Sequence, residues 1–248
     1  MSALRLFILD SIMLDTMLGV EDLRAGYGGK PVLQGATLAV AKGEIVAVIG
    51  RNGVGKSTLM KTLIGLISSM AGKISFAGHD ITGMEAFRRA QLGIGYVPQG
   101  RDVFPRMSVR ENLQVGESMR GWVDPAAYEQ VYRLFPILKE RNSQRAGTLS
   151  GGQQQQLALG RVLIGGPQMI LLDEPSEGIQ PSIVQDIGRI IVDLNRQTGM
   201  TILFVEQNLD MIKAIAQRCY VMDKGRIVAE LQPHELDDRN TVRNYLAV

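Results

Sequence analysis

Runs of consecutive apolar residues alternate along this chain with segments in which apolar residues recur at helical spacing. Residues 45–49, 169–172 and 201–205 are almost wholly apolar, which predicts short strands buried on both faces. Residues 59–64 and 183–194 repeat apolar positions every three or four residues, which predicts helices that bury one face. Buried strands that alternate with such helices indicate an α/β core.

Two regions depart from this pattern. Residues 18–40 predict several strands around a glycine-rich turn at 25–30, before any long helix, and therefore an antiparallel edge sheet beside the parallel core. From Gly100 to about Thr148 the chain is mostly helical and polar and is interrupted by prolines, which predicts a helical insertion. The expected fold is α/β, with an antiparallel β edge subdomain and a helical subdomain over about residues 100–160.

Residues 1–16 are expected to form an extension before the folded domain. Residues 4–14 are apolar but include charges of both signs, and no small-residue cleavage site follows them. They predict either a short amphipathic helix or an upstream extension, disordered or weakly helical, of a domain over residues 17–248; we favour the extension. No apolar run is long enough for a transmembrane helix, so the sequence predicts that the chain does not span a membrane by itself.

Composition argues against several classes of function. The 248 residues carry a formal net charge of +2 without a run of Lys and Arg, so no nucleic acid is expected as a partner. Cys219 is the only cysteine, which rules out an internal disulfide and fits a reducing compartment. His79 and His234 lie far along the chain from every motif, so no metal site built from His and Cys is expected.

The strongest chemical signal is a glycine-rich loop between a buried strand and a helix. It satisfies the pattern G-x-x-x-x-G-K-[ST] and comprises Gly50, Arg51, Asn52, Gly53, Val54, Gly55, Lys56, Ser57 and Thr58. Glycines let backbone N–H groups converge on phosphate oxygens, and the following helix adds the positive end of its dipole. Lys56 can then reach the β- and γ-phosphates, and the Ser57 hydroxyl can bind Mg²⁺. The loop therefore predicts a nucleotide site.

Two acids, Asp173 and Glu174, follow the apolar run at 169–172. Sheets of this class bind ligands at the carboxyl edge of their parallel strands, and a phosphate loop needs a carboxylate near its metal ion. We therefore expect these acids to reach the nucleotide site rather than to lie in solvent.

Two further features each allow two interpretations. The run Leu149-Ser150-Gly151-Gly152-Gln153 precedes a helix and forms either an anion site or an ordinary helix cap. Tyr27 lies on the glycine-rich turn and either stacks on a base or covers the edge of the sheet.

The order of these segments resembles that of the ATP-binding subunits of ABC transporters, over about residues 17–248. The phosphate loop comes first, Leu-Ser-Gly-Gly-Gln second and the Asp-Glu strand third. The resemblance implies a P-loop NTPase (ABC ATPase) core with ATP and Mg²⁺ as cofactors. It makes residues 50–57 the Walker A loop and Asp173 the Walker B acid, which holds Mg²⁺ together with Ser57. Glu174 is implied to be the base that orients the attacking water.

Other positions take their expected roles from the same resemblance. Tyr27 matches the residue that stacks on adenine, and Gln99 matches the Q-loop amide that senses Mg²⁺ and the γ-phosphate. Gln207 occupies the place of the catalytic switch histidine. The signature residues would reach the γ-phosphate of the opposite subunit: Ser150, Gly151, Gly152 and Gln153. A head-to-tail dimer with ATP buried between the two chains is therefore implied.

Two departures from the wider family indicate a subgroup. Glutamine replaces the switch histidine at position 207, and the loop Ser176-Glu177-Gly178-Ile179-Gln180 lacks the usual aspartate at its end. Both features resemble the second ATPase of branched-chain amino acid and urea importers, and several segments are closer to the urea branch. The implied function is ATP hydrolysis that energises uptake of branched-chain amino acids, urea or similar amides.

The resemblance also implies partners and a location. The expected assembly contains a homologous ATPase subunit, two integral membrane permease subunits and an external solute-binding protein, with this chain on the cytoplasmic face of the inner membrane. An ATPase that powers lipid export is the alternative, because such subunits share this core. A non-transport ABC protein acting on DNA or ribosomes is disfavoured, since the sequence has neither a long coiled coil nor a second cassette.

An apolar pair in the polar loop after Gln99, Val103 and Phe104, allows two interpretations as well. Phe104 either fills the core of the helical insertion or lies in the groove that, by the resemblance, receives a short cytoplasmic helix of a membrane subunit. We favour the groove.

Overall fold

A six-stranded sheet forms the centre of the molecule. The computed structural model describes residues 16–119, 121–122 and 124–245. Five strands of the sheet are parallel, and the sixth pairs antiparallel at one edge, in the order β10-β9-β3-β8-β7-β6. The strands are β3 (Ile45–Ile49), β6 (Ile94–Val97), β7 (Met169–Asp173), β8 (Thr201–Glu206), β9 (Arg218–Asp223) and β10 (Arg226–Leu231).

A second, antiparallel sheet has the order β2-β1-β4-β5 and confirms the predicted edge sheet. Its strands are β1 (Thr16–Tyr27), β2 (Lys30–Ala41), β4 (Ser69–Phe76) and β5 (His79–Asp80). The predicted wide turn at 25–30 is wrong, because strand pairing continues to Tyr27 and Lys30. Gly28 and Gly29 alone make the turn, with φ of 55° and 78°, as a tight hairpin of twisted strands requires.

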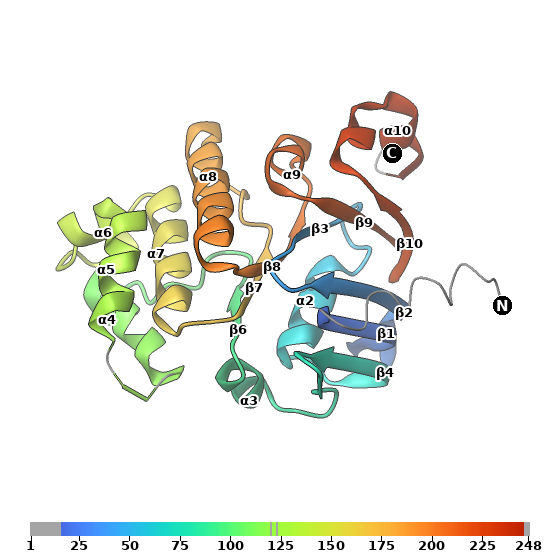
Figure 1. The fold of residues 1–248 in the computed structure, drawn as a ribbon, viewed down its shortest axis with the longest axis horizontal. Coiled ribbons are helices and arrows are strands. Elements are labelled where there is room, and N and C mark those ends of the chain that lie inside the picture. The colour runs from blue at the N-terminus through green and yellow to red at the C-terminus, as the bar shows by residue number, and fades with distance from the viewer. Residues whose placement is uncertain (1–15, 120, 123, 246–248) are drawn as a thin grey trace.

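Helix α2 (Lys56–Ile64) lies between the two sheets (Figure 1). Its apolar residues join the antiparallel sheet and one face of the central sheet in a single core, which includes Val46 and Val48 of β3. The alternate β3 residues Ile45 and Ala47 face a second core with α7 (Gly151–Ile164), α8 (Pro181–Thr198) and α9 (Leu209–Ile215). Both faces of β3 are thus buried, as its unbroken apolar run predicts.

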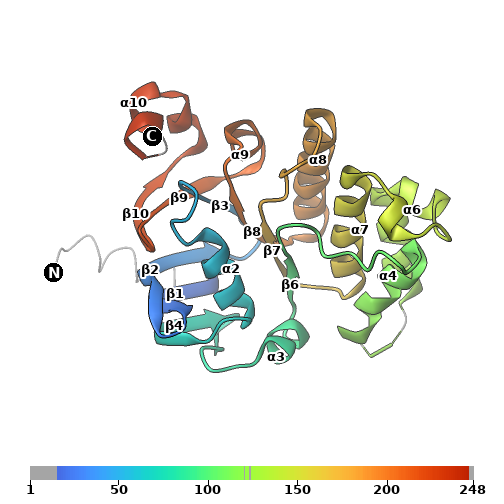
Figure 2. The ribbon, with the colours of Figure 1, turned by 180° about the vertical axis from the view of Figure 1, so that it is seen from behind.

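The remaining helices lie mainly at the end of the molecule opposite the antiparallel sheet (Figures 1 and 2). There α4 (Val109–Val115), α5 (Pro125–Leu134) and α6 (Pro136–Glu140) pack with α7. The other short elements are α3 (Ala86–Gln91), α10 (Arg239–Tyr245) and the 3-10 turns Gly116–Met119, Ala146–Thr148 and Pro233–Asp237. Residues 1–15 of the extension predicted over residues 1–16 lie outside the described residues, and Thr16 is the first residue of β1 rather than part of an extension.

The parallel strands place the candidate segments at one edge of the central sheet. The phosphate loop follows β3, Gln99 follows β6, Glu174 follows β7 and Gln207 follows β8. Because parallel strands have their carboxyl ends at the same edge, four segments that are far apart in the sequence converge there.

Candidate functional site

The phosphate loop folds as its glycines require. A Cβ atom at Gly50 would lie 2.4 Å from the carbonyl oxygen of Met222, so no larger residue fits. Gly55 caps α2 with φ of 113°, in the left-handed region that glycine enters without strain. Lys56 is 4% exposed and donates from Nζ to the carbonyl oxygens of Gly50 (2.8 Å) and Arg51 (3.0 Å). The loop therefore holds a buried ammonium group against its own backbone.

A pocket of about 240 Å³ opens over this loop. Its lining consists of Val32, Asn52, Gly53, Gly55, Lys56, Ser57, Thr58, Gln99 and Glu174. Three separate segments expected to act on a nucleotide thus share one pocket.

Asp173 lies buried beside the pocket, at the end of β7. Its Oδ1 accepts a hydrogen bond from Ser57 Oγ at 2.9 Å, and its Oδ2 accepts one from the Tyr96 hydroxyl at 3.2 Å. Burial raises the pKa of the Asp173 carboxyl, and the two hydrogen bonds oppose that rise. Sequence reasoning missed Tyr96; its place on β6, the strand that precedes Gln99, is the signal that could have found it.

Glu174 is the point at which the other segments meet. Its Oε1 lies 3.7 Å from Lys56 Nζ and accepts a hydrogen bond from Gln207 Nε2 at 2.9 Å. Its Oε2 accepts one from Gln99 Nε2 at 3.3 Å. The backbone of Glu174 has φ of 48°, a left-handed conformation that is unusual for this residue type and that persists where surrounding contacts enforce it. The carboxylate is thus held between one cation and two amides.

Glu206 is a second residue that sequence reasoning missed. This buried carboxylate ends β8 and accepts backbone N–H bonds from Ser176 (2.9 Å), Gln207 (2.6 Å) and Asn208 (3.1 Å). It therefore ties the loop after Glu174 to the loop that carries Gln207. An acid at the end of a buried strand, as at Asp173, is the signal in the sequence.

The signature residues and Tyr27 lie outside the described pocket. Ser150 caps α7: its Oγ accepts from the Gln153 N–H at 3.3 Å, while Gln153 Oε1 accepts from the Ser150 N–H at 3.0 Å. The capping interpretation of this run is thus present in the structure, and its role toward a phosphate stays a prediction. Tyr27 is 54% exposed at the hairpin turn, and its stacking on adenine also stays a prediction.

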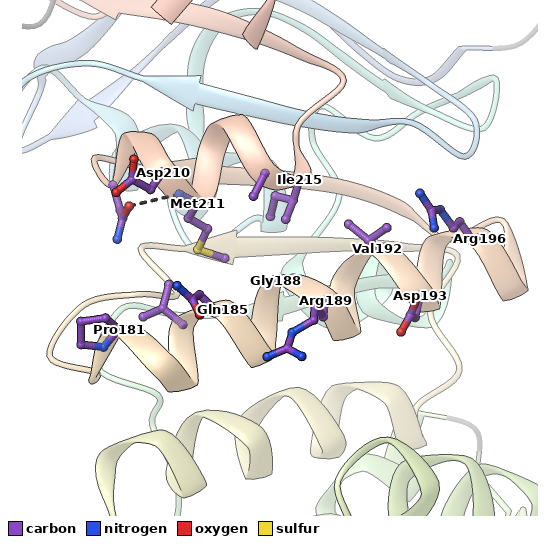
Figure 3. A pocket seen from close by; sticks show the side chains of 13 residues that line it. Pro181, Gln185, Gly188, Arg189, Val192, Asp193, Arg196, Asp210, Met211 and Ile215 are labelled. Atoms are coloured by element: carbon purple, nitrogen blue, oxygen red, sulfur yellow. Dashed lines mark hydrogen bonds between the residues drawn. The ribbon is translucent and has the colours of Figure 1, made fainter. Parts of the chain in front are cut away.

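A larger pocket, of about 560 Å³, lies elsewhere, between α8 and α9 (Figure 3). Apolar side chains such as Val192, Met211 and Ile215 line it, and its lining also includes Arg189 and Arg196. None of the expected site residues is among the described residues that line it. The larger of these two pockets is therefore not the one that contains the expected site residues.

Comparison with known proteins decides the family. Residues 33–177 match the family model described as ABC transporter. The chain belongs to this family. This ABC ATPase is 44% identical to the high-affinity branched-chain amino acid transport ATP-binding protein BraG of Pseudomonas aeruginosa, over 86% of this chain and 91% of that protein. It is 34% identical to the lipopolysaccharide export system ATP-binding protein LptB of Escherichia coli K12, over 92% and 96% of the two chains.

Solved structures agree with this assignment. The crystal structure of the ADP conformation of an ATP-binding cassette of an ABC transporter superposes with a TM-score of 0.80 at 30% identity, covering 92% of this chain and 97% of that one. The expectations for family, fold and ATPase activity are confirmed: this chain is the nucleotide-binding subunit of a transporter and hydrolyses ATP. Within the described residues, no helix has the length and apolarity needed to cross a membrane.

Proposed function

We propose that this ABC ATPase energises the import of branched-chain amino acids. The observation that carries the proposal is the higher identity to BraG (44%) than to LptB (34%) over most of the chain. Glutamine at position 207 and the altered loop at 176–180 support the same subgroup. The resemblance of several segments to urea importers makes urea a further solute to be tested.

Residues in and around the pocket would have different roles toward ATP. Backbone N–H groups of the phosphate loop and Lys56 would bind the phosphates, and Tyr27 would stack on adenine. Ser57 Oγ and Asp173 Oδ1, 2.9 Å apart, are hard oxygen donors of the kind that Mg²⁺ prefers, and Gln99 can add its amide oxygen. The metal ion would neutralise negative charge on the phosphates. The donor set at this position therefore fits Mg²⁺.

Glu174 is proposed to accept the proton of the attacking water. Its carboxylate is oriented by Gln99 and Gln207, and Lys56 Nζ lies 3.7 Å from it. Both amides can donate to the carboxylate or turn toward a phosphate oxygen, so they can report the presence of the γ-phosphate to the base.

The signature residues of this chain are proposed to complete the site of a homologous ATPase in a head-to-tail dimer. Their absence from the chain's own phosphate pocket supports that arrangement. Two integral membrane permeases and an external solute-binding protein would complete the importer. The dimer would then lie on the cytoplasmic face of the inner membrane.

Uptake measurements test the proposed solute. A strain lacking this chain should lose high-affinity uptake of labelled leucine, isoleucine and valine, and the wild-type gene should restore it. Loss of urea uptake with normal leucine uptake would instead assign the chain to the urea branch. Normal uptake of all four solutes, together with a defect in surface lipid, would favour the lipid-export alternative.

Gln207 leads to a pH prediction. Glutamine does not titrate, whereas a histidine at this position would change charge near its ordinary pKa of about 6.5. We expect the ATPase rate of Gln207→His to depend on pH between about pH 6 and 7, where the rate of the wild-type protein does not. The reason is that the neutral and the charged imidazole would contact Glu174 with different strength. Superimposable pH–rate profiles for the two proteins would contradict this role.

Phe104 is proposed to anchor a membrane subunit. The core interpretation is wrong, because Phe104 is 44% exposed. Its backbone is fixed by buried Asn112, which accepts from the Phe104 N–H at 2.8 Å and donates to its carbonyl oxygen at 3.0 Å. The Arg161 guanidinium lies over the ring, 5.2 Å from its centre. An exposed aromatic ring on a rigid support is typical of an interface anchor.

Truncating the Phe104 side chain should weaken assembly without affecting folding. We expect Phe104→Ala to keep the melting temperature and ATP affinity of the isolated chain but to weaken assembly with the membrane subunits by about 2 kcal/mol. Pull-downs and thermal melts on the same preparations measure both effects. Tyr245→Ala, at an exposed aromatic residue of α10, is the control and should assemble normally. Normal assembly of Phe104→Ala would defeat the anchor.

A further inference from the structure

The Arg101 side chain joins two functional loops of this chain. It leaves the segment just after Gln99 and donates from Nη2 to the backbone carbonyl oxygens of Glu177 (2.9 Å) and Gly178 (3.2 Å). Both carbonyls belong to the loop that follows Glu174. Hydrogen bonds from a charged donor are stronger than those between neutral groups, so this contact holds the two loops together.

The same guanidinium lies against the start of α7. A Cβ atom at Gly151 would stand 3.1 Å from Arg101 Nη1, and one at Gly178 would stand 3.3 Å from Nη2. These distances are shorter than ordinary contacts, so both glycines leave room for the guanidinium. Gly151 is a signature residue, so the Arg101 guanidinium lies beside the signature while it binds the loop after Glu174.

The backbone at this position is constrained too. Arg101 has φ of 74° and Asp102 has φ of 44°, conformations that non-glycine residues rarely adopt unless surrounding contacts enforce them. Arg161 of α7 donates to the Arg101 carbonyl oxygen at 3.5 Å, a long contact. Main chain and side chain of Arg101 thus both connect to the signature helix.

We propose that Arg101 is a positioning residue that couples the two ATP sites of the dimer. Gln99, two residues before it, contacts Glu174 in the chain's own pocket, while Gly151 belongs to the signature that would close over the partner's ATP. A shift of Gln99 on nucleotide binding would therefore move the guanidinium that separates the signature from the loop at 177–178. The proposal rests on the head-to-tail dimer proposed above.

The test uses the transporter complex purified through a tag on this chain, with ATPase rate measured against ATP concentration. For wild type we expect a Hill coefficient above 1. Arg101→Ala should lower turnover and bring the Hill coefficient to 1, because the coupling between the two sites, commonly worth about 5-fold or more in affinity, would be lost. Nucleotide affinity of the isolated chain should stay unchanged, since no contact of Arg101 involves the phosphate loop among the described residues.

Two further variants distinguish coupling from general loss of structure. Arg101→Lys keeps the charge but lacks the planar fork, so it should give intermediate turnover and cooperativity. Arg133→Ala, at an exposed arginine of α5, should behave as wild type. Arg101→Ala with a wild-type Hill coefficient would overturn the proposal. A wild-type complex with a Hill coefficient of 1 would also overturn it, and a tag that captures no second ATPase subunit or permease would instead refute the proposed assembly.

Discussion

Lys56→Ala is expected to weaken ATP binding by about 10- to 100-fold, the value of a desolvated charge contact to phosphate. Lys56 is nearly inaccessible to solvent, and burial lowers its pKa, while Glu174, Asp173 and Glu206 favour its charged form. The ammonium is therefore kept charged by its neighbours in a place where water cannot screen it. Alanine leaves the phosphates without this charge and the carbonyls of Gly50 and Arg51 without their donor.

Titration with a fluorescent ATP analogue measures this effect. Lys73→Ala removes an exposed lysine from β4 and serves as the control, with affinity expected at the wild-type level. Thermal melts on the same samples separate lost binding from lost folding, because the Lys56 bonds also stabilise the loop. An unchanged dissociation constant for a folded Lys56→Ala protein would remove this residue from the phosphate site.

Unlike Lys56→Ala, Glu174→Gln should still bind ATP. Its turnover should fall by about 10²- to 10⁴-fold, and ATP-bound dimers should accumulate. The amide has the shape of the carboxylate but cannot accept the proton of the attacking water. The site can accommodate it, because the amides of Gln99 and Gln207 can turn to present their oxygens to the new NH₂ group. Asp173, the proposed Mg²⁺ ligand, is unchanged in this variant.

Single-turnover hydrolysis and size-exclusion chromatography with ATP provide the two readouts. Glu129→Gln changes an exposed carboxylate of α5 in the same way and should leave both unchanged. A Glu174→Gln protein with a near-normal rate would exclude Glu174 as the base. A slow protein that stays monomeric with ATP would leave the base role intact and contradict the proposed dimer.

The residues of the ATP site carry the least information about which solute is transported. The residues that contact ATP would be the same in an importer of leucine and an importer of urea, since none of them is expected to touch solute. Similarity over most of the chain, 44% to BraG against 34% to LptB, supports the proposed import over lipid export. Contacts with the permeases, proposed at Phe104, are where such a difference would act.

The sequence by itself determined the contiguous parts of this protein. The phosphate loop, the helix that starts at Gly151 and the strand that ends in Asp173 each depend on neighbouring residues, because glycine conformations, helix starts and apolar runs are local properties. The predicted edge sheet was right for the same reason. Its turn was placed too widely, since only pairing across the hairpin decides where a turn begins.

Tertiary structure alone decided which side chains meet. The hydrogen bonds of Tyr96 to Asp173 and of Gln207 to Glu174 join residues on different strands, and the contact of Arg101 with the loop at 177–178 spans more than seventy residues. No periodicity predicts such contacts, because the lateral order of strands and the direction of each side chain arise from packing of the whole sheet. The same packing left Phe104 at the surface, which its apolar character alone did not reveal.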